Sequence, residues 1–461
     1  MMATAAPVAT ISADDKSTVL ERWYVLFIMM LAYTINIADR YVMSTVLEPI
    51  RLELKLTDGG VAFLTGVSLA LYSVTMGIPL SWIADRYNRR NLLAISITVW
   101  SAMTTLCGLS TTYLQLLLAR IGVGIGEAGG TPSCNAIVGD YFPADRRPMA
   151  MTIFALGAPI GAWLGADMAG FVANKYGWHA AFLVLGIPGI LLAGVIMLTI
   201  KEPKRGRLDA VSTEEAPSFA TTLAFFFKQK AAFHVIMGSG VSALWGWGLM
   251  WFTPTFLQRA YGLNVGEAGS VVGPIHLVMG ISASLLTAWL LSRPSFVDPR
   301  RIVKLLAVVT ALATIPSILA YWTHSLSMAT AMLWIFIPAI YFYIGPAFAL
   351  GQNLAPPRMR AMFTAIALLI ANVFNLIVAP QCVGWLSDFI AALQKNPDFA
   401  SFIPGVSWLG ANLAGFVGVD EASSLRFALL VLAPTGFWAT WHYWMAARTI
   451  IEDQKTAIGY V

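Results

Sequence analysis

The sequence predicts an all-α membrane protein in which twelve transmembrane helices form two six-helix bundles. Apolar residues fill 58% of the 461 positions and charged residues only 11%. Soluble domains carry roughly 25% charged residues, so this chain has too few charges to cover a water-exposed surface. Twelve apolar windows of membrane-spanning length, with one long hydrophilic interruption after the sixth, lead to the same fold class.

Each window approaches the roughly 20 apolar residues that a helix needs to cross the hydrocarbon core of a bilayer. Charged turns separate most neighbouring windows and so define their number better than their boundaries. In chain order, the predicted spans are 23–47, 60–84, 92–111, 114–138, 149–172, 179–200, 231–257, 267–292, 302–322, 327–351, 360–387 and 423–446.

The hydrophilic interruption divides the chain into halves with equal numbers of spans, as in transporters built from internal repeats. The first residues lack a charged segment followed by a short apolar run and a cleavage site, so no signal peptide is expected. The predicted organisation is a disordered cytoplasmic tail at 1–22, a bundle at 23–200, a cytoplasmic linker at 201–230, a bundle at 231–447 and a cytoplasmic tail at 448–461.

Lys and Arg residues concentrate in alternate loops, on the side of both termini. The loops of the opposite side carry only Arg51, Lys55, Lys175, Arg259 and Lys395. By the positive-inside rule, both termini and the linker are expected to be cytoplasmic, in a multi-pass protein of a bacterial inner membrane. The formal net charge of +5 therefore reflects topology in the lipid bilayer. No nucleic-acid partner is expected, because no basic domain lies outside the membrane.

The sequence contains no pattern for a metal, a cofactor or an enzymatic reaction. Gly124-x-Gly126-x-x-Gly129 matches the dinucleotide-binding fingerprint only formally, because no strand precedes it. No His or Cys pair has metal-ligand spacing, and no nucleophile and base form a recognisable set. Small apolar packing is the expected role of the three cysteines, Cys107, Cys134 and Cys382. We therefore predict no cofactor, no metal and no enzyme.

Two motifs accompany the second and fourth spans. Residues 81–90 read Ser-Trp-Ile-Ala-Asp-Arg-Tyr-Asn-Arg-Arg, and residues 120–128 read Arg-Ile-Gly-Val-Gly-Ile-Gly-Glu-Ala. Both resemble segments of the major facilitator superfamily, and the Tyr-Asn variant resembles its spinster-like branch. The first departs from the family pattern Gly-x-Leu-Ala-Asp-Arg-x-Gly-Arg-Arg at Ser81 and Asn88. Further similar segments are 36–41, 140–147, 356–361 and 384–388, and the likeness extends over about residues 22–450.

This resemblance implies the major facilitator fold, in which two bundles rock to open a central site to each side alternately. For the spinster-like branch it also implies lysophospholipids or sphingoid phosphates as substrates. An amphipathic substrate suits the sequence, since the first half carries the intramembrane charges and the second is mostly apolar and aromatic. The residues expected to contact the substrate are Arg40, Asn36, Trp245, Tyr343, Gln352, Asn372 and Asn375.

Charged residues interrupt the apolar windows at Asp39, Arg40, Arg120 and Glu127. An ion in the hydrocarbon region costs several kcal/mol and is by default a candidate for function. At about 1.5 Å per residue, Asp39 and Arg120 come to similar depth in the outer part of the membrane, with Glu127 deeper. We predict a proton relay in which Asp39 and Glu127 compete for Arg120, a use of acidic residues that the resemblance also implies. The alternative is a static ion pair that fixes helix register.

Arg40 lies about 100° round the helix from Asp39 and is expected to face a different neighbour. Two partners remain open for its guanidinium, an anionic substrate or a second acidic residue.

The loop after the second span predicts a gate, because an acid among its arginines can pair with a neighbouring helix and hold one side shut. Simple anchoring by positive charge explains the arginines but not the acid. The corresponding loop of the second half, 292–301, lacks an acid at the matching place, so the gate is expected to be asymmetric. The predicted gating residues are Asp85, Arg86, Arg89, Arg90, Arg146 and Arg147.

Three functions follow in order of preference. The first is a proton-coupled secondary transporter that moves an amphipathic, anionic substrate by alternating access. The second is a proton symporter that takes up a small organic or aromatic acid. The third is a receptor or assembly protein that does not transport, which leaves the intramembrane acids without a role.

Overall fold

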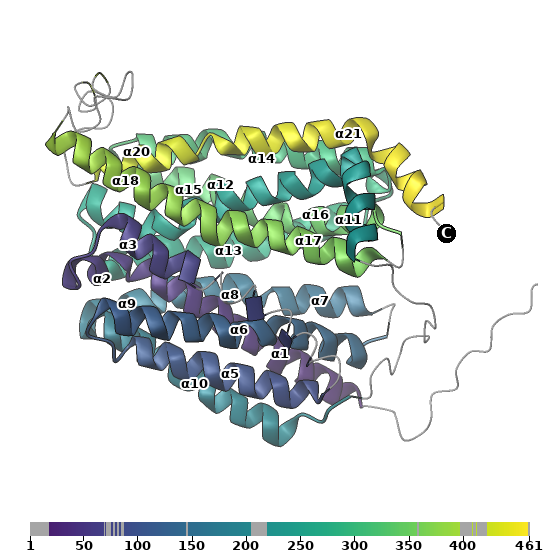
Figure 1. Ribbon diagram of the computed structural model, residues 1–461, viewed down its shortest axis with the longest axis horizontal. Helices are drawn as coiled ribbons and strands as arrows, with labels where there is room; N and C mark the ends of the chain where they lie inside the picture. The colour runs from purple at the N-terminus through teal and green to yellow at the C-terminus, as the bar shows by residue number, and fades with distance from the viewer. Residues whose placement is uncertain are drawn as a thin grey trace, which may run out of the picture.

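The computed structural model describes residues 18–68, 70, 75–76, 79–80, 83, 87–143, 146–203, 219–356, 359–396, 408, 412 and 422–459. Within these residues the regular structure is entirely helical. Figure 1 shows the helices running side by side along the length of the molecule, those of the first half below and those of the second half above. The predicted all-helical membrane fold is confirmed.

The first half begins with one long helix and includes two segments of π-helix that interrupt later spans. Its elements are α1 (Val19–Thr45), α2 (Leu47–Glu53), α3 (Asp58–Ala62), η2 (Phe63–Val67), α5 (Arg89–Cys107), α6 (Tyr113–Tyr141), α7 (Arg147–Ala155), α8 (Gly157–Trp163), η3 (Leu164–Met168), α9 (Ala169–Tyr176) and α10 (Trp178–Thr199). The predicted fifth span therefore consists of α7, α8, η3 and α9.

The second half repeats this plan with a third π-helical segment in its eleventh span. Its elements are α11 (Phe219–Lys228), α12 (Lys230–Tyr261), α13 (Val265–Leu291), η4 (Pro294–Phe296), α14 (Pro299–Trp322), α15 (Leu326–Phe342), α16 (Ile344–Asn353), α17 (Arg360–Asn372), η6 (Val373–Val378), α18 (Ala379–Lys395), α20 (Ser423–Leu432) and α21 (Thr435–Gly459). Two helices include residues outside the predicted spans. The whole of α11 lies in the predicted linker, and α21 continues from the twelfth predicted span into the predicted tail.

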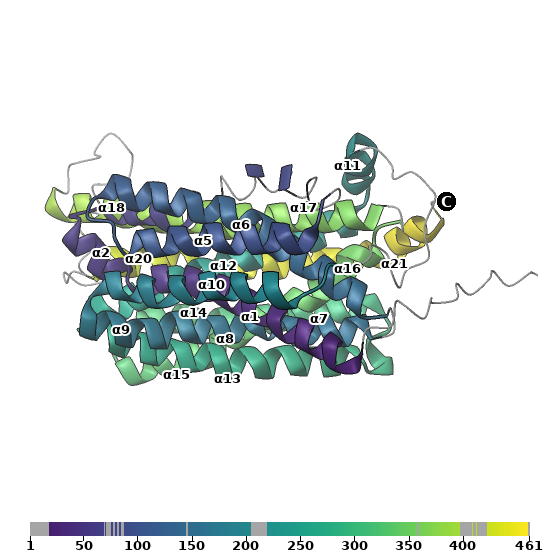
Figure 2. The same cartoon turned by 90° about the horizontal axis from the view of Figure 1, so that it is seen from below.

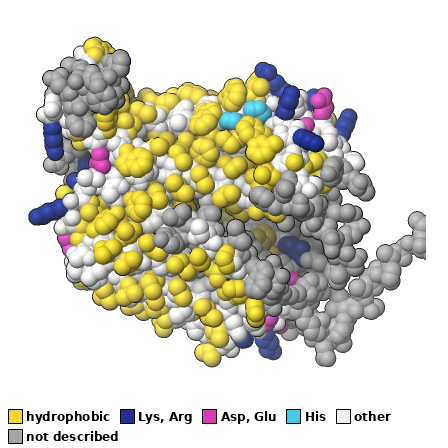
Figure 3. Space-filling model, in the orientation of Figure 1, with side chains coloured by type: hydrophobic (Ala, Val, Ile, Leu, Met, Phe, Trp, Pro, Cys, Tyr) yellow, Lys and Arg dark blue, Asp and Glu magenta, His cyan; other side chains and the backbone are white. Residues whose placement is uncertain are grey.

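Eight helices in the described part of the chain are long and apolar enough to cross a membrane. Hydrophobic side chains cover the middle of the surface in Figure 3, with Lys and Arg gathered toward its ends. This pattern is that of a protein surrounded by lipid, in which polar groups are confined to the interfaces. The predicted second span is described only at its start and at scattered positions.

The two ends of the molecule are named here for the orientation that the loop charges predict. At the inner end α1 begins and α21 ends, and at the outer end lie α2, α3, α18 and α20 (Figures 1 and 2). The bundles touch most extensively where α3 meets α18 and where α13 meets α8, η3 and α9.

Glycines allow these helices to approach closely. A Cβ on Gly384 of α18 would lie 2.6 Å from the backbone oxygen of Asp58, which is closer than real side chains come. Within the first bundle, a Cβ on Gly161 or Gly165 would collide with the backbone of α1. Small residues at such crossings allow backbone-to-backbone packing in membranes. The outer contact between α3 and α18 therefore depends on Gly384.

Candidate transport site

Asp39 of α1 and Arg120 of α6 form an ion pair inside the first bundle. The distance from Arg120 Nη1 to Asp39 Oδ2 is 3.0 Å, and the two side chains are 1% and 2% exposed. The hydroxyl of Thr104 on α5 donates to the other Asp39 oxygen at 2.5 Å. Three helices thus meet at one carboxylate, as the depth of Asp39 and Arg120 in the sequence predicted.

Arg40, the next residue of α1, pairs with Glu127 of α6. Its Nη2 lies 2.7 Å and its Nε 3.2 Å from Glu127 Oε2. Arg40 is 23% exposed, whereas the Glu127 side chain is 1% exposed. The second oxygen of Glu127, Oε1, is buried and has no hydrogen-bond partner among the described residues. One oxygen of this buried carboxylate is therefore available to bind a proton.

The observed pairing corrects the predicted one. Asp39 and Glu127 were expected to compete for Arg120, but each has an arginine of its own. Adjacent positions on a helix point about 100° apart, so Asp39 reaches Arg120 while Arg40 reaches Glu127 one face further round. The second acidic partner considered for Arg40 is therefore Glu127. Exchange within this group requires one of the pairs to break first.

Three of the expected substrate residues, Asn36, Trp245 and Tyr343, are buried in this conformation. Trp245 has no exposed surface, and its indole N–H donates to Ser317 at 3.0 Å inside the second bundle. Tyr343 packs against Trp247 in the same bundle, and Asn36 lies buried on α1. Trp245 is thus a packing residue here, because its indole faces α14 rather than the other bundle.

The other expected substrate residues lie on the tenth and eleventh spans and differ in exposure. The side-chain oxygen of Asn375 accepts a hydrogen bond from the Trp251 indole at 2.9 Å. Asn372 is half-buried one turn earlier, and Gln352 is exposed at the end of α16. Asn375 therefore orients an aromatic side chain of the second bundle, while Asn372 and Gln352 remain accessible.

The predicted gating arginines make contacts within the first bundle. Arg89 lies 2.6 Å from Asp140 and 3.4 Å from Glu202. The backbone N–H of Arg90 donates to Glu202 at 2.7 Å, and Arg147 donates to the Gly139 oxygen at 2.7 Å. In this conformation Arg89 and Arg90 connect α5 to α6 and to the segment after α10. Of the other predicted gating residues, Arg146 is exposed at the start of α7, and Asp85 and Arg86 lie outside the described residues.

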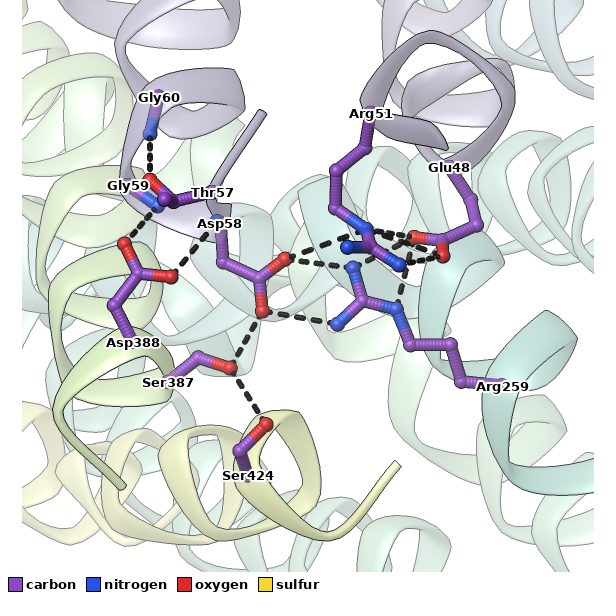
Figure 4. Close-up of polar contacts among 10 residues, drawn as sticks. All are labelled: Glu48, Arg51, Thr57, Asp58, Gly59, Gly60, Arg259, Ser387, Asp388 and Ser424. Atoms are coloured by element: carbon purple, nitrogen blue, oxygen red, sulfur yellow. Dashed lines mark hydrogen bonds and ion pairs between the residues drawn. The ribbon is translucent and has the colours of Figure 1, made fainter. Parts of the chain in front are cut away.

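A second charged cluster joins the two bundles at the outer end (Figure 4). Arg259, from the last turn of α12, donates to Glu48 at 2.6 and 2.8 Å and to Asp58 at 2.6 and 2.9 Å. Arg51 also binds Glu48, at 2.6 Å. We call Glu48, Asp58 and Arg259 the outer latch, because Arg259 of the second bundle holds two acids of the first.

Asp388 of α18 reinforces the latch from the second bundle. Its carboxylate accepts hydrogen bonds from the backbone N–H groups of Asp58 at 2.9 Å and Gly59 at 2.8 Å. The hydroxyl of Ser387 donates to Asp58 at 2.6 Å and also contacts Ser424. A carboxylate at the free N–H groups of a helix start is a favourable arrangement. The start of α3 is thus held by α18 through both backbone and side chain.

The environment of Asp58, just before the predicted second span, keeps its carboxyl ionised. Burial alone would raise its pKa, but the hydrogen bonds and charge of Arg259 outweigh burial and hold the pKa of Asp58 below its usual value. The latch is therefore an ionic contact throughout the neutral range.

Sequence reasoning missed this latch. Arg259 was counted only as a rare cation on the outer side, which is itself the signal that could have singled it out. Its partners Glu48 and Asp58 lie more than 200 positions away in the chain, so no local pattern connects them.

Residues 29–380 match the profile of the Major Facilitator Superfamily. The chain belongs to this superfamily. A crystal structure of a bacterial homolog to the human lysosomal transporter Spinster, inward-facing and unoccupied, has a TM-score of 0.77 and 29% identity, covering 95% of this chain and 99% of that one. This places the transporter in the spinster-like branch, as the motifs predicted, and the chain is not an enzyme.

Two curated relatives cover most of this transporter. An MFS-type efflux pump of Mycolicibacterium smegmatis is 29% identical over 98% of this chain and 100% of its own length. The sphingosine-1-phosphate transporter SPNS2 of Mus musculus is 25% identical over 93% of this chain and 78% of its own length. The protein is therefore a multi-pass membrane transporter.

Proposed function

We propose that this protein is a proton-coupled secondary transporter that moves an amphipathic, anionic substrate by alternating access. The observation that carries the proposal is the pair of buried carboxylate–arginine contacts on α1 and α6, in which Glu127 retains one free oxygen. Ionisable groups at such depth are rare unless they serve ion or substrate movement. We further propose that the inner end faces the cytoplasm of a bacterial cell.

Proton binding at Glu127 would couple to the substrate through Arg40. A protonated Glu127 no longer attracts the guanidinium, which leaves Arg40 as an unpaired charge next to the central path. Arg40 is the more exposed partner of the pair, so it can turn toward an anionic group. Substrate and carboxylate would then compete for the same arginine, and Asp39 with Arg120 would provide a second pair of the same kind.

Alternating access would require the outer latch to break. The latch closes the outer end, while Arg89 and Arg90 at the inner end bind Asp140 and Glu202 of their own bundle. This arrangement fits an inward-facing state, the state of the related bacterial structure. In the opposite state, we propose, Arg89, Arg90, Arg146 and Arg147, with Asp85 and Arg86, hold the inner end shut.

The proposed substrate class combines an anionic head with an apolar chain. Arg40 would provide the charged contact, and the second bundle would supply a largely apolar and aromatic wall together with the amides of Gln352, which is exposed, and Asn372, which is half-buried. The relative named for sphingosine-1-phosphate transport supports this class.

The proposal is tested by flux into proteoliposomes with and without an imposed pH gradient, using a panel of lysolipids and aromatic acids. We expect gradient-stimulated lysolipid flux that Asp39→Asn and Glu127→Gln abolish. Glu267→Gln is the matched control, because Gln keeps the helix cap that Glu267 forms at the exposed start of α13. Flux of aromatic acids alone would support the organic-acid symporter instead. The proposal would be contradicted if no compound of the panel were transported, or if gradient-driven flux were unchanged in both Asp39→Asn and Glu127→Gln.

A further inference from the structure

A layer of aromatic side chains crosses the bundle interface on the inner side of the outer latch. The first bundle contributes Tyr41 of α1 to this layer. Its ring centre lies 5.8 Å from Trp251, 6.2 Å from Trp247 and 4.9 Å from His276. Tyr341 of α15 completes the layer, 5.7 Å from Trp247. We call these five residues the aromatic layer.

His276 of α13 occupies an unusual place in this layer. Its side chain has no exposed surface, and its Nδ1 lies 2.9 Å from the Tyr341 hydroxyl. The other ring nitrogen, Nε2, is buried and has no hydrogen-bond partner in the described part of the chain. Buried polar atoms are rarely left unpaired, and each such atom calls for an explanation.

No described carboxylate contacts the His276 ring. The titratable groups that face it are the hydroxyls of Tyr41 and Tyr341. Further out along α13, Asp167 of η3 lies against Gly273, but its carboxylate already accepts hydrogen bonds from Ser270 at 2.7 Å and Trp163 at 3.0 Å. On α1, the charge of Arg40 is matched by Glu127. An imidazolium at His276 would therefore be a positive charge without a counter-ion.

Burying an unpaired charge in apolar surroundings is strongly unfavourable. His276 must consequently be neutral while the outer end is closed. The ring packs edge-on against Tyr41 of the opposite bundle, so separation of the bundles at the outer end uncovers it. Water then reaches the ring, and an imidazole in water takes up a proton near about pH 6.5.

We propose that His276 is a second proton-binding site, in the C-terminal bundle, that is loaded from the outer side and must be emptied before the outer end closes. By linkage, protons that bind only the open state favour it. One such proton changes the ratio of open to closed molecules by up to about tenfold per pH unit. The inference rests on the proposed alternating access, but not on the roles of Asp39 and Glu127.

The test measures outer opening directly, by electron–electron double resonance between spin labels at Lys175→Cys and Ser327→Cys, with the exposed Cys382 replaced by alanine. Both label positions are exposed on outer turns, one in each bundle. All measurements use full-length protein in nanodiscs between pH 8 and pH 5.5. The background variant Asp39→Asn with Glu127→Gln removes the titrations of the other proposed proton sites.

We expect acidification in this background to raise the ratio of long-distance to short-distance molecules about fivefold between pH 6.5 and pH 5.5. Adding His276→Asn should abolish the response, since an amide can keep the contact with Tyr341 but cannot take up a proton. His442→Asn is the matched control. It replaces another buried histidine of the second bundle, which contacts His234 at 3.0 Å rather than the other bundle. The control should respond like the background.

A full pH response in the His276→Asn variant would overturn the inference, and so would the absence of any response in the background. Neither result depends on proton-driven flux, which is the separate test of the roles of Asp39 and Glu127. If the His276→Asn variant does not fold, NMR of the histidine side chains replaces the spin-label measurement. The His276 ring should titrate near about pH 6.5 when Arg259→Ala weakens the latch and should stay neutral to pH 5.5 in the wild type. Equal titration in both proteins would overturn the inference.

Discussion

Replacing Arg259 by alanine removes the only member of the outer latch that belongs to the second bundle. Its side chain and those of Glu48 and Asp58 are each less than a tenth exposed. Removing one partner from such a buried ionic contact typically costs about 3–5 kcal/mol. The contact exists only when the outer end is closed, so this cost falls on the closed state alone.

At the lower limit of about 3 kcal/mol, the ratio of outer-open to outer-closed molecules should rise roughly a hundredfold. The spin-label distance across the outer end, measured at pH 7.5, reports this ratio. Arg51→Ala is the matched control. Arg51 contacts Glu48 at 2.6 Å and Asp58 at 3.9 Å, but both contacts lie within the first bundle, and Arg51 is 24% exposed. The same loss of charge should therefore leave the distance distribution nearly unchanged. Equal distributions for Arg259→Ala and the wild type would refute the latch.

The pKa of Asp58 gives the latch a defined pH behaviour. Because this pKa lies below its usual value, the ionic contact is fully formed above the ordinary aspartate value of about 3.9. It weakens only as the pH falls through the lowered pKa. Between pH 5 and pH 8 the contact of Arg259 with Asp58 should therefore add no pH dependence to the outer end.

Two further predictions concern packing and stability. Gly384→Val should prevent outer closure and slow transport, because a Cβ there meets the Asp58 backbone at 2.6 Å; a wild-type distance distribution and flux would contradict this. Arg89→Ala should lower the thermal midpoint by several degrees, since it removes the buried ionic contact with Asp140 and breaking such a contact costs about 3–5 kcal/mol. Arg90→Ala, which leaves that pair intact, should lower it less, and equal midpoints would show that the Arg89 contact contributes little.

The sequence was sufficient for most of the long helices and for part of the ion-pair cluster. Apolar length predicts helices directly, and the rise per residue placed Asp39 and Arg120 at one depth, where the structure joins them. Depth alone does not give the rotation of two helices about their axes. The pairing of Arg40 with Glu127 therefore could not be chosen over a contact with substrate.

The remaining elements depend on tertiary arrangement. Trp245 was expected at the substrate because aromatics cluster in its span, yet its indole points into the second bundle and donates to Ser317 of α14. His276 was one of several isolated histidines in the sequence. Only the approach of Tyr41 from the other bundle shows that it lies at the interface.

Proton movement during a single substrate pulse tests the central claim most directly. Proteoliposomes with a trapped pH-sensitive dye, given lysolipid without an imposed gradient, should show a pH change with the wild type. They should show none with Glu127→Gln, which removes the ionisable carboxylate beside Arg40. A pH change of equal size with Asp39→Asn, Glu127→Gln and the wild type would mean that protons travel by another route, and would contradict the account.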